Sequence, residues 1–114
     1  MRPADVIRLR HMLEAAEHAV NFVAHRQRTD LERDPQLTLS LLKALEIMGE
    51  AANKVSAETQ TTHPQVPWRD MVTMRNWLIH VYFDVNLDIV WNTIKDDLPP
   101  LIDQLRAILC ETEG

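Results

Sequence analysis

The most chemically capable part of the sequence is residues 74–83, MRNWLIHVYF. Its polar side chains are a guanidinium, an amide, an imidazole and a phenol, contributed by Arg75, Asn76, His80 and Tyr82. Such groups are costly inside an apolar helix unless they meet partners or water. An imidazole can move a proton near neutral pH, and an arginine fork fits phosphate oxygens. The segment could therefore act on a phosphate ester, or its polar groups could simply be satisfied at a helix end.

The spacing of these residues limits how they can meet. On an α-helix with about 100° per residue, Asn76 and His80 share a face because they are four positions apart. Arg75 and His80 are five positions apart and point roughly 140° from each other. One straight helix cannot easily aim both side chains at one atom. Either the helix ends or bends near His80, or a second copy of the chain completes the site, which predicts a homodimer.

The elements that must position this segment are helices. The chain has only two glycines and no alternating runs of strong β formers, and its apolar residues recur in steps of three and four. We predict helices that start near residue 3, span about 36–57, start at residue 68, span about 87–97 and run from about 101 to 110. Residues 27–34 are expected to form a connection and 58–67 a loop, and Pro99-Pro100 should break the fourth helix.

Four or five amphipathic helices in a chain of 114 residues predict one all-α domain over residues 1–114, an antiparallel four- to five-helix bundle. The first two helices are the longest and should form its frame. Gly49 costs about 1 kcal/mol against alanine inside a helix, so we expect it to permit the close approach of a neighbour. Glu50 and Asn53 lie on one flank of that helix, where they are either solvated or line a pocket facing Arg75.

The charge distribution argues against a general nucleic-acid binder. The net charge is −5, and residues 84–114 contain seven acidic and two basic side chains. Proteins that bind nucleic acid without selectivity present a basic face to the phosphates. Any contact with RNA should therefore be local and centred on Arg75.

We predict no metal site and no cofactor. His11, His18 and His25 recur at intervals of seven, but residues two helical turns apart lie about 10 Å from each other along the axis. The single cysteine, Cys110, cannot form an internal disulfide, which is typical of cytosolic proteins. No apolar run approaches the roughly 20 residues of a membrane span. We expect a cytoplasmic protein that does not enter the membrane.

Four ordered blocks of sequence carry a family resemblance: IMGEAAN (47–53), VPWRDM (66–71), MRNWLIHVYF (74–83) and a tail of VWNTI (90–94) followed by DLPPL (97–101). Through them, the chain from about residue 37 to residue 105 resembles the HepT family of small HEPN-domain toxins. A lone arginine and histidine at this spacing would be a weak signal, whereas the ordered set of blocks is a specific one.

The resemblance implies a helical bundle that dimerises and acts as a metal-independent endoribonuclease. Its catalytic residues would be Arg75, Asn76 and His80, in a composite site at the dimer interface where the ribose 2′-OH attacks the phosphate. The resemblance also implies that a minimal nucleotidyltransferase antitoxin of the MntA type neutralises this toxin by attaching AMP to Tyr82. The alternative is a non-catalytic HEPN module that partners such a nucleotidyltransferase, in which Arg75 and His80 hold the interface together.

Overall fold

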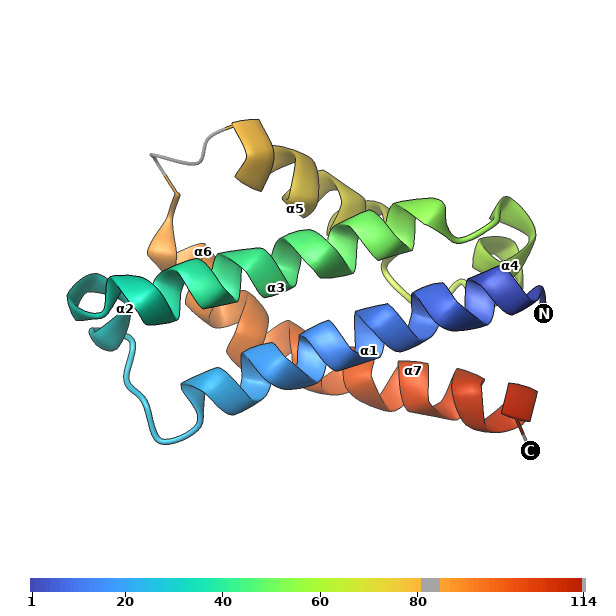
Figure 1. The fold of residues 1–114 in the computed structure, drawn as a ribbon, viewed down its shortest axis with the longest axis horizontal. Helices are drawn as coiled ribbons and strands as arrows, with labels where there is room; N and C mark the ends of the chain where they lie inside the picture. The colour runs from blue at the N-terminus through green and yellow to red at the C-terminus, as the bar shows by residue number, and fades with distance from the viewer. Residues whose placement is uncertain (81–84, 114) are drawn as a thin grey trace.

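A computed structural model describes the backbone of residues 1–80 and 85–113, and the side chains of residues 1–78 and 85–112. All regular secondary structure in these residues is helical, which confirms the predicted all-α class (Figure 1). Within the same residues, none of the helices has the combination of length and apolar character that a membrane crossing requires.

Two long antiparallel helices form the frame of the bundle, as predicted. They are α1 (Pro3–Val23) and α3 (Pro35–Lys54), with 21 and 20 residues, and they pack against each other (Figure 1). Each has a proline in its first turn, where the missing N–H leaves no internal hydrogen bond unmade. The start of α3 is capped by Asp34, whose carboxylate accepts a hydrogen bond from the Leu37 N–H at 3.1 Å.

Two further helices lie on either side of this frame. α5 (Trp68–His80) packs on α3, and α7 (Leu98–Glu113) packs on α1, so that the order across the bundle is α5, α3, α1, α7 (Figure 1). The apolar stripes of these helices meet in one core. Its most deeply buried large side chains include Leu9, Met12, Leu41, Leu45, Leu98, Leu105 and Ile108.

The region expected to be a loop at residues 58–67 begins with a short helix, so that part of the prediction is wrong. The second long helix ends at Lys54, and α4 (Ala57–Thr62) follows. The break occurs because Ser56 takes an extended conformation and caps the new helix, its hydroxyl accepting from the Thr59 N–H at 3.3 Å. The charged connection after α1 likewise contains one helical turn, α2 (Asp30–Arg33).

The prediction that Pro99-Pro100 breaks the fourth helix is also wrong. α6 (Leu87–Asn92) continues through a π-helical turn (Thr93–Asp97) directly into α7. The two prolines fall in the first turn of α7, where a missing N–H is tolerated. Asn86 caps the start of α6, because its side chain accepts hydrogen bonds from the N–H groups of the two residues at positions 88 and 89.

Candidate active site

α5 carries the backbone of the three predicted catalytic residues, Arg75, Asn76 and His80. Its inner side is fixed by apolar burial, since Met71 and Leu78 are both 5% exposed. Asn76 is exposed and Arg75 is half-buried. The side chain of His80 and the whole of Tyr82, the predicted AMPylation site, lie outside the described residues.

Arg75 has a buried polar atom without a partner among the described residues. Its Nε is shielded from solvent and makes no hydrogen bond to any described residue. A buried donor left unpaired costs about 1–3 kcal/mol, so native structures rarely retain one without a reason. A phosphate oxygen is an acceptor that an arginine N–H binds strongly. Among the predicted site residues whose side chains are described, Arg75 is therefore the one whose surroundings suggest an external ligand.

The base of the Arg75 side chain rests against the backbone of α3 at Gly49. A Cβ added to Gly49 would lie 2.4 Å from Arg75 Cβ and 2.7 Å from the Met71 carbonyl oxygen. Real Cβ atoms essentially never approach other atoms so closely. The expectation that Gly49 permits a close approach is thus confirmed, and the neighbour that approaches is the helix bearing Arg75.

Glu50 and Asn53, the possible pocket residues, are both exposed and lie on different sides of α3. Glu50 lines a pocket with Arg8 of α1, and its carboxylate lies 3.5 Å from the Nζ of Lys54. Asn53 lines a pocket that also includes Thr73 of α5. Asn53 thus belongs to the side of α3 that faces α5, whereas Glu50 is turned toward α1.

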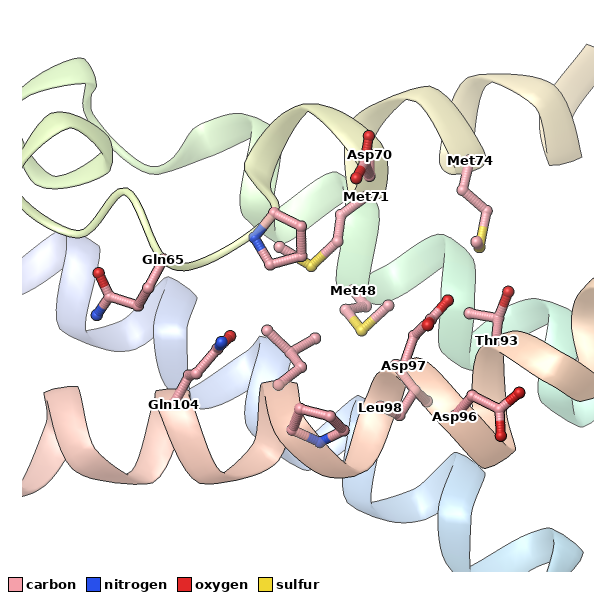
Figure 2. A pocket seen from close by; sticks show the side chains of 13 residues that line it. Met48, Gln65, Asp70, Met71, Met74, Thr93, Asp96, Asp97, Leu98 and Gln104 are labelled. Atoms are coloured by element: carbon pink, nitrogen blue, oxygen red, sulfur yellow. The ribbon is translucent and has the colours of Figure 1, made fainter.

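A separate pocket of about 320 Å³ lies between α3, α5, the π turn and α7 (Figure 2). Among the described residues, its lining holds three carboxylates, those of Asp70, Asp96 and Asp97, and no basic side chain. Gln104 also lines the pocket, and its Oε1 atom is buried without a hydrogen-bond partner among the described residues. Carboxylates and an amide oxygen would repel an RNA phosphate, so this pocket does not suit the polynucleotide.

The three aspartates of this pocket do not form a metal site. Across the residues that the structure describes, no group of three or more His, Cys, Asp or Glu side chains is placed to hold a metal ion. Figure 2 shows the carboxylates of Asp96 and Asp97 pointing in different directions from the π turn. Their spacing in the sequence therefore does not bring their oxygens together at one point.

A second buried charge, Asp5, lies near the start of α1 and was missed by the sequence analysis. It is only 3% exposed and accepts three hydrogen bonds. The donors are the Ser56 N–H at 3.0 Å, the Ser56 hydroxyl at 2.6 Å and the Thr59 hydroxyl at 2.7 Å. Burial alone would raise the pKa of Asp5, but these bonds, with the charge of Arg2, outweigh it and hold that pKa below its ordinary value.

The fold and the residues on α5 together define a small helical-bundle protein with a HEPN-type motif of arginine, polar residue and histidine. The family model described as "Ribonuclease HepT-like" matches residues 12–108, a span that contains this motif. The chain therefore belongs to the HepT-like ribonuclease family, and the resemblance seen in the sequence is confirmed.

The names of two relatives point the same way. The chain is 39% identical over 101 residues to a protein of Caldanaerobacter subterraneus subsp. tengcongensis named "Putative RNase", with 89% of this chain and 90% of the relative covered. It is 37% identical over 93 residues to the "Probable ribonuclease HepT" of Thermococcus cleftensis, covering 82% and 84%. No solved structure gives a significant match.

Proposed function

We propose that this chain is a metal-independent endoribonuclease with an active site built on Arg75, Asn76 and His80. The observation that carries the proposal is the buried Nε of Arg75, which has no acceptor among the described residues. An RNA phosphate would supply that acceptor and gain a charge-assisted hydrogen bond. Membership of a family named for ribonucleases, and relatives that carry the same designation, support this choice of ligand.

In the proposed reaction the ribose 2′-OH attacks the adjacent phosphorus. The new O2′–P bond forms while the P–O5′ bond breaks, leaving a 2′,3′-cyclic phosphate and a 5′-OH end. His80 removes the proton from the 2′-OH or donates one to the departing O5′. Arg75 stabilises the charge that develops on the non-bridging oxygens, and Asn76 orients the imidazole or the phosphate.

We further propose that two copies of the chain form one composite site. Arg75 and His80 are five residues apart on α5, so an ideal helix directs them roughly 140° from each other. A second copy would bring one chain's arginine to the other chain's histidine. It would also supply two imidazoles, one to act as base and one as acid.

The biological role that we propose is that of a cytoplasmic toxin. Its antitoxin is a minimal nucleotidyltransferase of the MntA type, which silences it by attaching AMP to Tyr82. A phosphoryl group two residues after His80 would place negative charge near Arg75 and compete with the RNA backbone. Intact-protein mass spectrometry after coexpression should show the addition of one AMP group, and Tyr82→Phe should abolish it.

The nuclease proposal is tested with purified wild-type protein, Arg75→Ala and His80→Ala. Matched controls are Arg106→Ala and His18→Ala, which remove the same side-chain types from α7 and α1. We expect both site variants to lose at least about 10²-fold in RNA cleavage, as is usual when a transition-state donor is removed. The controls should cleave at the wild-type rate, and a chelator should not slow the wild-type protein.

A different outcome would support the alternative function. If folded wild-type protein leaves every tested RNA intact and still binds a nucleotidyltransferase, the chain is a non-catalytic HEPN module. In that case Arg75→Ala and His80→Ala should weaken the complex instead, as measured by calorimetric titration.

A further inference from the structure

α3 and α5 approach each other closely at Gly49. A Cβ at this position would lie 2.4 Å from Arg75 Cβ, 3.1 Å from Arg75 Cγ and 2.7 Å from the Met71 carbonyl oxygen. Two of these three atoms cannot rotate away. The Met71 oxygen belongs to the backbone, and Arg75 Cβ is bonded directly to the Cα of Arg75. Any side chain at Gly49 would therefore have to displace α5 as a whole.

The surrounding contacts leave little room for such a displacement. On α3, the neighbours of Gly49 that face the core are almost fully buried: Leu45, Met48 and Ala52 are 1%, 2% and 0% exposed. Protein interiors are close-packed, so a shift of one helix is felt by every side chain in its interface. A glycine costs about 1 kcal/mol at this helical position, yet it allows α5 to approach the backbone of α3 closely here.

We infer that Gly49 is a positioning residue for Arg75. Its missing Cβ sets how deeply the stem of Arg75 lies against α3, and this depth keeps Nε buried and without an acceptor from the described chain. The guanidinium is thus held in one place before any ligand arrives. The inference rests on the proposed function only for the ligand that the guanidinium binds. The position of the guanidinium can be measured without RNA.

The direct test is the exchange of the Arg75 Nε–H with solvent. In a ¹H–¹⁵N spectrum of the full chain, the signal is assigned by its loss in Arg75→Lys. We expect the wild-type Nε–H to exchange at least tenfold more slowly than that of an exposed arginine such as Arg69. Gly49→Ala should abolish this protection, because the added methyl pushes the arginine stem out of its contact with α3.

A matched control separates this effect from a general disturbance of the helix. Ala51→Ser also adds one heavy atom to α3, but on the side that lines a pocket with Arg8 and His11. We expect this variant to keep the protected Nε–H signal of Arg75. If Gly49→Ala retains the protection, or Ala51→Ser loses it equally, the positioning role is overturned.

RNA cleavage gives the second readout. Gly49→Ala should reduce cleavage at least tenfold when Arg75 is present, and should have no further effect in an Arg75→Ala background. A loss that persists without Arg75 would show that Gly49 acts in some other way. If the wild-type protein cleaves no RNA but Gly49→Ala exposes Nε, the nuclease proposal fails while the positioning role stands.

Folding provides a last check, because Gly49→Ala is a tight substitution. Should that variant not fold, it is combined with Arg75→Gly, which removes the two arginine carbon atoms nearest to the new methyl. Recovery of the folded state, followed by circular dichroism, would locate the conflict at the Gly49–Arg75 contact. Failure of the double variant to recover would locate the conflict at the Met71 carbonyl oxygen, not at the arginine stem, and would contradict the inference.

Discussion

Asp5 and Arg75 both have buried polar atoms, and the described residues around them treat those atoms in opposite ways. Asp5 is sealed near the start of α1, and three donors from Ser56 and Thr59 satisfy its carboxylate. Arg75 lies at the crossing of α3 and α5, and its Nε meets no acceptor among the described residues. Burial has a cost in both places. At Asp5 neighbouring residues offset that cost, whereas at Arg75 no described residue does so, and we propose that an RNA phosphate does.

The largest effect is expected from Arg75→Met, which keeps an unbranched stem and removes the guanidinium. RNA cleavage should fall by about 10²–10³-fold. The free energy of unfolding in urea should stay constant or rise by about 1 kcal/mol, because an unsatisfied donor has been removed. Unchanged cleavage, or a clear loss of stability, would show that Arg75 is satisfied in the native chain like Asp5.

Asp5→Asn should give the converse result. The amide keeps one acceptor oxygen, but its NH2 group replaces the other. That group faces donors of Ser56 and Thr59 and cannot accept their hydrogen bonds. We expect the free energy of unfolding to drop by about 1–3 kcal/mol. RNA cleavage well below the unfolding temperature should not change. Asp103→Asn, an exposed site on α7, is the control and should leave both measurements unaffected.

A smaller effect of Asp5 is expected in the pH dependence of the free energy of unfolding. Its pKa is lowered in the folded state from the ordinary value of 3.8, so the unfolded chain binds the proton more readily. The stabilisation is therefore complete above pH 3.8 and is lost as the pH falls through the folded pKa. In acid titrations followed by circular dichroism, wild type should lose stability over this range, relative to Asp5→Asn. Parallel curves would show that the carboxylate gains nothing from its partners.

The smallest effect is expected at Arg28, an arginine that already has partners. Its Nε lies 2.6 Å from Asp88 and a terminal nitrogen lies 3.2 Å from Glu32. The hydrogen bond to Asp88 raises the pKa of Arg28, although both contacts are at the surface. Arg28→Ala should lower the melting temperature slightly, and added salt should remove the difference. A loss of stability as large as that of Asp5→Asn would contradict the expectation that Arg28 contributes the least.

The long helices could be predicted because their evidence is local. The periodic apolar residues of α1 and α3 determine which face is buried, wherever the neighbours lie. The short helix α4 and the π turn depend instead on Ser56 capping and on a change in hydrogen-bond spacing. Neither leaves a periodic signal, and the proline pair near the start of α7 suggested a break that the structure does not have.

For the candidate site, the sequence supplied residue types but not their surroundings. Gly49 was recognisable because a glycine is costly within a helix. The Nε of Arg75, which has no partner among the described residues, was not recognisable, since its burial depends on how closely α3 and α5 cross. Glu50 follows Gly49 by about 100° of helical rotation and so turns toward α1, while Asn53 stays on the Gly49 side, one turn further on. Asp5 and its donor Ser56 are 51 residues apart, beyond the reach of any local pattern.

The π turn at Thr93–Asp97 has a consequence for the tolerated length of the chain. A helix that continues without interruption from α6 into α7 couples the rotational setting of the two segments. Inserting one residue there would rotate α7 by about 100° and swing Leu105 and Ile108 from the core into water. A deletion is different, because a π turn holds one residue more than an α turn and can lose it by becoming α-helical. The irregular stretch between α1 and α2 could absorb an insertion. Natural insertions should therefore accumulate before α2 and be absent between α6 and α7.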